Sequence, residues 1–148
     1  MGIIKRLQLK VIRIAVFIFM VWVSYQYFWG RHLYTITAYC NCPICIDIAS
    51  YRDGKFASGK KIYWGGVAAD PSVPMGAKVD LVPQTPRDLM DIFTLLHGRF
   101  HYRVEDRGGK IKGRDIDIYI PDSRGGHKQA LKWGKRKMRI KINGRLAQ

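Results

Sequence analysis

The sequence predicts a mainly β protein, a small closed barrel of about six short strands preceded by an N-terminal hydrophobic helix. Three observations lead to this prediction. Fifteen Gly and six Pro among 148 residues indicate a body rich in turns. Short segments in which every second residue is apolar recur through the second half of the chain. Hydrophobic residues make up 47% of the chain, which excludes disorder for most of it.

The first thirty residues predict a membrane anchor. Residues 14–23 carry no polar side chain, and residues 11–30 would span about 30 Å as a helix, the thickness of a bilayer core. Basic residues precede this span and few follow it, so the positive-inside rule places the N-terminus in the cytoplasm. A cleaved signal peptide is the alternative, although no small-residue cleavage site follows the apolar residues.

Three segments of the chain are therefore expected. Residues 1–10 form a cytoplasmic basic N-terminus, residues 11–30 a transmembrane signal anchor, and residues 31–148 a folded domain. This domain would lie in the cell envelope, on the periplasmic or extracytoplasmic side of the inner membrane.

Within the domain, alternation of polar and apolar residues predicts the strands. They are expected over residues 35–39, 65–70, 78–82, 100–105, 115–120 and 138–142. An insertion over residues 83–97 carries a short amphipathic helix at 88–96. It would form either part of a substrate groove or a surface loop, and we favour the loop. A further helical turn is expected at 127–133. In the fifth strand, isoleucines at 116, 118 and 120 share one face, which leaves Asp115, Asp117 and Tyr119 on the other.

Three aspartates lie beside small residues. Asp70 follows two alanines, Asp106 comes shortly before two glycines, and Asp117 occupies the polar face of a strand. Small neighbours let a ligand approach the backbone, and a partly desolvated carboxyl near other carboxylates can act as a general acid. Spacing alone is also compatible with solvated or salt-bridged aspartates on a very basic protein.

The segments around these aspartates resemble the three-aspartate (3D) domain. The first signature is matched by VAADPSVPMG at 67–76, and the second by VEDRGGKIKG at 104–113 followed by DIDIY at 115–119. The upstream elements of the family are matched by TAY at 37–39 and ASG at 57–59. The resemblance covers residues 35–142, and the domain is shared with membrane-bound lytic murein transglycosylase A and stationary-phase survival proteins.

The resemblance implies a six-stranded double-psi β-barrel that acts on peptidoglycan. The implied activity is a lytic transglycosylase that cleaves the MurNAc-GlcNAc β-1,4 bond and forms 1,6-anhydromuramic acid. Asp117 matches the position of the catalytic acid, while Asp106 and Asp70 would tune the acid and bind the sugar. The alternative is a non-catalytic peptidoglycan-binding or wall-loosening module on the same barrel. The resemblance further implies a set of substrate-binding residues, namely Thr37, Tyr39, Ser58, Gly108, Gly109, Lys112 and Tyr119.

Four residues depart from the family pattern, and two of them, Ala69 and Met75, are changes of little consequence. Arg107 stands beside Asp106 where a small or hydroxylic residue is usual, and a cation there would lower the pKa of nearby acids. This argues against a strong acid role for Asp106. Phe56 stands where the family has Thr, with no consequence evident from the sequence.

Cys40, Cys42 and Cys45 form a C-x-C-x-x-C cluster with three interpretations. It could hold a metal with a fourth ligand such as His32 or Asp47, form a disulfide such as Cys40–Cys45, or remain as free thiols. The catalytic site itself is expected to need no metal and no cofactor. The remaining histidines, at 97, 101 and 127, share no ligand spacing, so structural or surface roles are expected.

The positive charge indicates an anionic partner. The chain carries 26 Lys+Arg against 11 Asp+Glu, a formal net charge of +15. In the cytoplasm such a balance would favour nucleic acid, whereas outside the membrane anionic glycopeptide strands or lipid headgroups are the natural partners. We therefore expect peptidoglycan glycan strands and the inner membrane as partners, and no nucleic acid.

Overall fold

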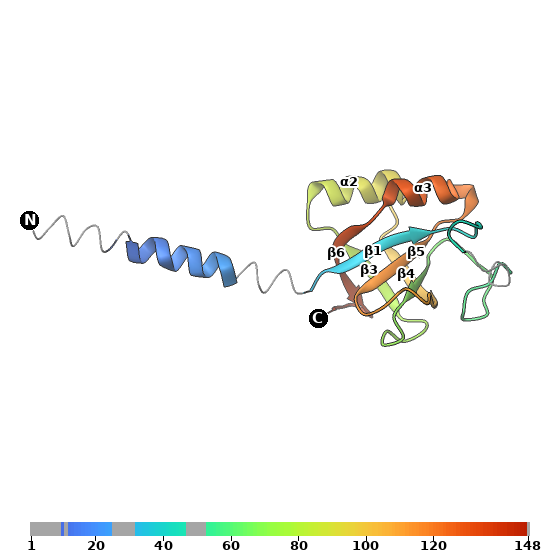
Figure 1. Cartoon of the computed structure of the whole chain (residues 1–148), viewed down its shortest axis with the longest axis horizontal. Coiled ribbons are helices and arrows are strands. Elements are labelled where there is room, and N and C mark those ends of the chain that lie inside the picture. Colours follow the sequence, from blue (N-terminus) through green and yellow to red (C-terminus); the bar gives the residue numbers. More distant parts are fainter. Residues whose placement is uncertain (1–9, 11, 25–31, 47–52, 148) are drawn as a thin grey trace, which may run out of the picture. The chain divides into compact units, whose positions relative to one another are not determined.

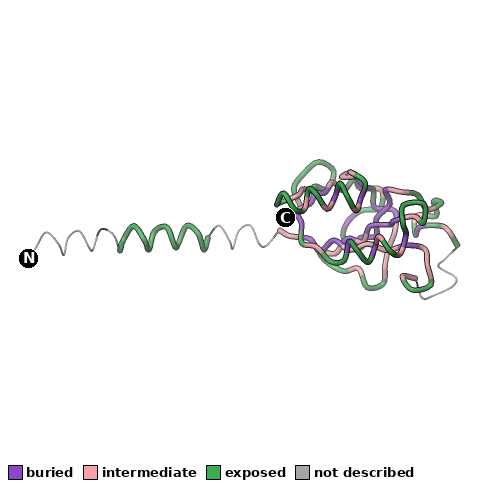
Figure 2. The backbone as a smooth tube through the Cα atoms, turned by 90° about the horizontal axis from the view of Figure 1, so that it is seen from above, coloured by how far each residue is buried: buried purple, intermediate pink, exposed green. Residues whose placement is uncertain are grey.

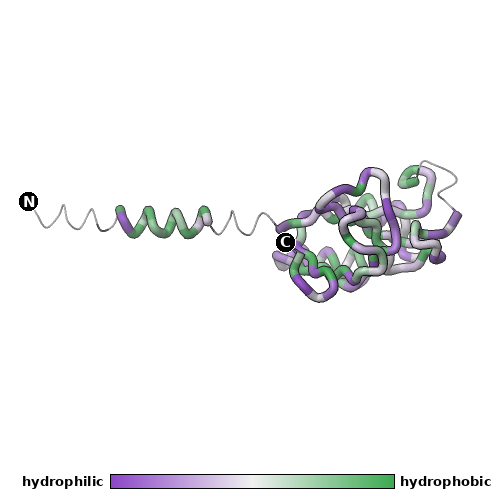
Figure 3. The backbone as a smooth tube through the Cα atoms, turned by 90° about the horizontal axis from the view of Figure 1, so that it is seen from below, coloured by the Kyte–Doolittle hydropathy of each residue, from purple (hydrophilic) through white to green (hydrophobic). Residues whose placement is uncertain are grey.

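The computed structural model describes residues 10, 12–24, 32–46 and 53–147, and divides the chain into two units. The first comprises Met1–His32 with Gln148, and the second Leu33–Ala147. In the first unit, residues 12–24 are helical, exposed and largely hydrophobic (Figure 3). Both ends of the expected anchor, residue 11 and residues 25–30, lie outside the described residues. No helix in the described ranges combines the length and the hydrophobicity needed to cross a bilayer.

The second unit is a closed barrel of six strands (Figure 1). Around the barrel the order is β1-β5-β2-β4-β3-β6, and β6 pairs with β1 to close it. The strands are β1 (Tyr34–Tyr39), β2 (Gly66–Ala69), β3 (Lys78–Val82), β4 (His101–Asp106), β5 (Asp115–Tyr119) and β6 (Arg136–Ile142). The prediction of a closed six-stranded barrel is confirmed. A two-residue strand, β7 (Arg145–Leu146), extends the sheet beside β6 and was not predicted.

Two of the six pairings are parallel, which distinguishes this barrel from an up-and-down barrel. β1 runs parallel to β5, and β2 runs parallel to β4, while the remaining neighbours are antiparallel. Parallel neighbours need long connections, so strands far apart in sequence become adjacent. This arrangement brings β1, β2, β4 and β5 together at the candidate site.

The barrel interior is filled by the apolar residues that alternate along the strands. On β5, Ile116 and Ile118 are fully buried, and on β6 the same holds for Met138 and Ile140. Figure 2 shows the buried segments in purple inside the second unit. Strand β2 is buried along its whole length, and on its outer face the ring of Phe56 covers Gly66.

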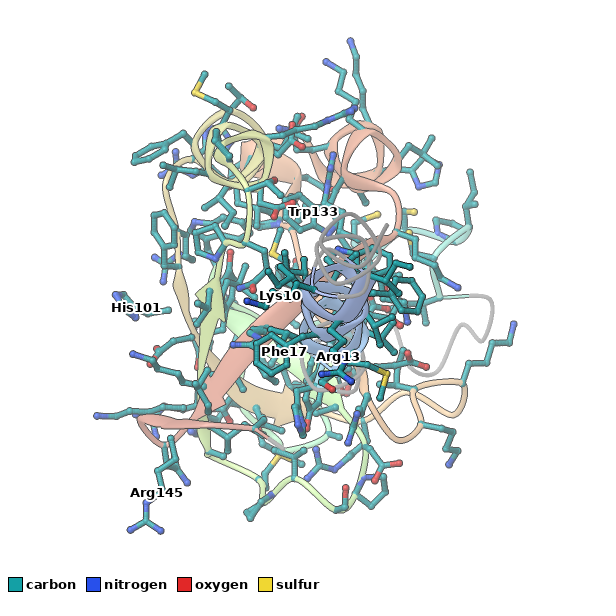
Figure 4. All side chains as sticks on the ribbon, turned by 90° about the vertical axis from the view of Figure 1, so that its left-hand side faces the viewer. Lys10, Arg13, Phe17, His101, Trp133 and Arg145 are labelled. Atoms are coloured by element: carbon teal, nitrogen blue, oxygen red, sulfur yellow. The ribbon has the colours of Figure 1, made fainter. Side chains whose placement is uncertain are left out.

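Two helices lie side by side on one flank of the barrel (Figure 1). The first, α2 (Pro86–Leu95), starts two residues earlier than expected because Thr85 and Asp88 form a capping box and Pro86 begins the helix. The second, α3 (Gly126–Trp133), follows a short 3-10 turn, η2 (Asp122–Arg124). It ends at Trp133, which is labelled in Figure 4 and donates its indole N–H to the carbonyl of Ile36 at 3.2 Å.

Candidate active site

A cavity of about 760 Å³ lies against the outer face of the barrel. Its floor is formed by residues of β1, β2, β4 and β5, and its walls by the segments 41–46, 53–62 and 107–111. Asp106 and Asp117 both line it. No residue of the 83–97 insertion lines it, so the insertion is not part of this cavity. The insertion is not a surface loop either, because its helix is capped and Ile92 and Leu96 are fully buried.

Asp117 faces this cavity because its neighbours in β5 face the core. Ile116 and Ile118 fill the barrel interior, so the alternation of the strand turns the carboxyl of Asp117 outward. Thr37, its register partner on β1, donates a hydrogen bond of 2.8 Å to Oδ1. The pKa of Asp117 is raised to about 6, chiefly by burial and also by the charges of Asp106 and Asp115, against the opposing effect of the hydrogen bond from Thr37.

Asp106 and Asp117 lie on opposite sides of Ala68. In the strand register, Ala68 of β2 pairs with Asp117 of β5 and with Asp106 of β4. Two strand spacings place the backbones of the two aspartates about 10 Å apart. Ala68 lines the cavity between them, and its methyl group leaves room for a ligand.

The carboxylate of Asp106 is held by two donors. The hydroxyl of Tyr39 donates to Oδ2 at 2.5 Å, and the backbone N–H of Ala57 donates to Oδ1 at 2.9 Å. Burial together with the charge of Asp106 raises the pKa of Tyr39 well above its usual value, so this phenol remains a donor. A carboxylate has about four acceptor positions, which leaves Asp106 able to accept from a sugar hydroxyl as well.

An aromatic row supports the cavity and accounts for Phe56. Its ring packs edge-on against Tyr119 and Tyr63, with centroids 5.5 Å apart in each pair, and Tyr119 in turn contacts Tyr39 at 5.5 Å. The ring also covers Gly66, where an added Cβ would lie 2.2 Å from it. Phe56, which replaces the threonine of the family pattern, is therefore a buried aromatic residue that packs the 53–62 segment against β2 and β5.

Asp70 does not line the cavity. Its carboxylate accepts hydrogen bonds of 2.8 Å from the backbone N–H groups of Ser72 and Gly113. Hydrogen bonds from Ser72, then from Gly113, and the charge of Lys112 lower the pKa of Asp70 to about 2. Asp70 thus joins the turn after β2 to the end of the loop at 107–113, whose first residues form a cavity wall.

Arg107 uses its guanidinium on backbone carbonyls. It donates to the carbonyl of Val73 at 2.7 Å and to those of Ala69 and Asp106 at 3.2 Å each. From the sequence, this cation was expected to lower the pKa of neighbouring carboxyl groups. Its hydrogen bonds instead fasten the cavity wall to the end of β2.

The predicted substrate-binding residues separate into two groups. Tyr39, Gly108, Gly109 and Tyr119 line the cavity. The other three do not line it. Thr37 donates a hydrogen bond to Asp117, Ser58 lies beside Glu105, and Lys112 lies beside Asp70.

Sequence reasoning passed over Glu105, the single glutamate of the chain. Its side chain is 1% exposed and forms an ion pair of 2.7 Å with Lys60. Burial would raise the pKa of Glu105, but the ammonium of Lys60 and the hydroxyls of Ser58 and Tyr63 bring it below its usual value. Tyr63 also donates to Glu105 at 3.1 Å. Glu105 therefore holds residues 58–63 on the barrel, a role for which the sequence carries no signal beyond the rarity of glutamate in this chain.

Chemically, the site offers one carboxyl that can carry a proton near neutral pH and a second held among donors. Asp117 combines burial with a pKa of about 6, the properties of a general acid. The two groups flank a cavity large enough for sugar residues.

Comparisons with known proteins find likeness only among solved structures. No known family matched the chain, and neither did any curated protein. The lytic transglycosylase MltA from E. coli matches with 24% identity and a TM-score of 0.38, and a structure of MltA with bound chitohexaose matches with 25% identity and a TM-score of 0.40. Each match covers 60% of this chain and 26% of MltA. The chain therefore spans about a quarter of the length of these proteins.

Proposed function

We propose that the barrel is a peptidoglycan lytic transglycosylase in which Asp117 acts first as acid and then as base. The observation that supports this most directly is the protonatable carboxyl of Asp117, turned toward a cavity that it shares with Asp106. The three-aspartate signatures at 67–76 and 104–119 supply the reaction class.

In the first step, protonated Asp117 gives its proton to the glycosidic oxygen between MurNAc and GlcNAc. The bond from that oxygen to C1 of the muramic sugar breaks, GlcNAc leaves with a free hydroxyl, and positive charge develops at C1. The carboxylate of Asp117, now ionised, stabilises this charge across the cavity.

In the second step, Asp117 takes the proton of the muramic C6 hydroxyl while O6 bonds to C1. The product is the 1,6-anhydro sugar, no water is consumed, and Asp117 returns to its protonated form. One carboxyl serves both steps, unlike the carboxylate pairs of ordinary glycosidases. Asp106 would orient the sugar and keep the pKa of Asp117 raised, and Asp70 would hold the loop at 107–113.

The experiment is a digest of purified sacculi with the full chain in detergent, read by mass spectrometry. We expect 1,6-anhydromuropeptides from the wild type, none from Asp117→Asn, and wild-type products from Asp115→Asn, a matched change on the same face of β5. The initial rate should fall as the pH rises above about 6, because the protonated carboxyl starts the reaction. A wild type that sediments with sacculi but releases no anhydro product, beside an active control enzyme, would instead identify a binding module.

We further propose that the barrel lies on the periplasmic or extracytoplasmic side of the inner membrane, anchored through residues 11–30. The exposed apolar side chains of residues 12–24 support this location, since such a surface needs a nonpolar partner. The net charge of +15 suits anionic wall strands and lipid headgroups.

A further inference from the structure

A cluster of sulfur and nitrogen ligands lies beside the cavity. Cys40, Cys42, Cys45 and His127 each contribute one ligand atom, and these atoms all lie within 4.8 Å of one another. His127 comes from the first turn of α3, whereas the cysteines follow β1. The three thiols are free, and the Sγ atoms of Cys40 and Cys45 are 3.6 Å apart, far beyond the length of a disulfide bond.

The distances fit a tetrahedral zinc ion. Zinc binds sulfur at about 2.3 Å and imidazole nitrogen at about 2.0–2.1 Å, so tetrahedral corners are about 3.8 Å apart for two sulfurs and about 3.6 Å for sulfur and nitrogen. Nδ1 of His127 lies 3.6 Å from Sγ of Cys42 and 3.5 Å from Sγ of Cys45. Three thiolates and one imidazole form a donor set that zinc prefers, and four protein ligands leave no position for water.

The backbone of residues 40–46 holds the cysteines in a turn that follows β1. The turn is closed by a hydrogen bond of 2.9 Å from the N–H of Ile46 to the carbonyl of Cys42. The C-x-x-C spacing of Cys42 and Cys45 is a usual zinc-ligand spacing.

We propose that Cys40, Cys42, Cys45 and His127 bind one structural Zn²⁺ ion that joins the 40–46 segment to α3. Asn41, Ile44 and Cys45 line the cavity, so the ion would fix one wall of the candidate active site. His127 would be the fourth ligand, in place of His32 or Asp47, the candidates named from the sequence. The sequence analysis had expected only a structural or surface role for His127. The zinc site does not depend on the proposed reaction and would stand if the barrel only bound glycan.

The test measures zinc in the full chain, purified in detergent under reducing conditions from zinc-supplemented cells. Elemental analysis should find about one zinc per chain in the wild type and in His101→Ala, and a loss of most of it in His127→Ala. His101 is a matched control because it points away from β4 (Figure 4), its side chain is 84% exposed, and it is no member of the cluster. Replacing zinc with Co²⁺ should give the thiolate charge-transfer and ligand-field bands of a tetrahedral S₃N site.

Three results would overturn the proposal. They are a reduced wild type that binds no zinc when zinc is added, a disulfide among the three cysteines in protein extracted with a thiol trap, and equal zinc content in His127→Ala and the wild type. Should His127→Ala fail to fold, the zinc content and cobalt spectrum of the wild type decide the question. The measurement needs no peptidoglycan, so its failure is distinct from failure of the proposed function.

Discussion

At the scale of single residues, burial of the Asp117 carboxyl lets it carry a proton near neutral pH and also lowers the free energy of unfolding. Its pKa rises from the ordinary 3.8 to about 6 in the fold, chiefly through burial. In the unfolded chain the carboxyl ionises at lower pH than in the folded one. The free energy of unfolding therefore falls as the pH rises from about 4 to about 6, and the loss remains above that range.

The Asp117→Asn variant should consequently be more stable than the wild type at pH 7, by up to about 3 kcal/mol for a shift of about two units, because Asn cannot ionise. The difference should shrink toward zero near about pH 3, below both pKa values, where the wild-type carboxyl is protonated in both states. Thermal unfolding at the two pH values measures it. Asp53→Asn serves as control, since it also removes one negative charge from a very basic chain, does not act on the pKa of Asp117, and keeps an oxygen to accept from the N–H of Lys55. Equal gains in both variants, or a gap independent of pH, would contradict the raised pKa.

At the scale of elements, the short strand β2 determines what the site can accept. Its two alanines face opposite ways, because Ala68 lines the cavity and Ala69 is fully buried among the core residues. Ala68 also separates the two carboxylates through its register with β4 and β5. A larger side chain at position 68 would occupy the space where a ligand has to lie.

We expect Ala68→Val to lower the release of anhydromuropeptides at least tenfold while changing stability little, because the added methyl groups enter the cavity. Ala69→Val should do the reverse and lower the free energy of unfolding by about 1–3 kcal/mol through overpacking of the core. Product assays and thermal unfolding of both variants measure this contrast. Full activity in Ala68→Val would show that the substrate does not pass between Asp106 and Asp117.

Several elements followed directly from local pattern. The strand expected at 78–82 is β3 to the residue, and β1 and β5 deviate by one residue at an end, because alternation records which face is buried. The start of α2 was misplaced because its capping box precedes the amphipathic pattern that predicted the helix. Strand β7 has two residues, too few for alternation to show.

At the scale of the whole molecule, the exposed apolar helix needs a nonpolar environment, whereas the basic barrel suits an aqueous one. The large side chains of residues 12–24 are mostly more than half exposed, and residues of this kind are seldom left in water together. The barrel carries its own buried core and an excess of basic groups. The proposed anchor satisfies the helix in lipid and leaves the barrel facing the anionic wall.

For this location we expect the full chain in the membrane fraction, with a reporter fused after residue 148 active only outside the cytoplasm. Deleting residues 1–30 should abolish reporter activity, because the same segment directs export. As a control, a change from Lys to Gln at Lys141, within the barrel, should leave the location unaltered. A cytoplasmic reporter signal from the full chain would contradict both the anchor and access to peptidoglycan.

The sequence by itself determined the six strands of the barrel and the aspartates worth considering, because alternation and short motifs are local properties. Only the tertiary structure decided which of these groups meet. It paired Thr37 with Asp117, set Ala68 between two carboxylates, placed Asp70 outside the cavity and brought His127 to three cysteines more than eighty residues earlier. The physical reason is that barrel closure and strand register fix contacts between distant segments, and neither is written in the spacing of neighbouring residues.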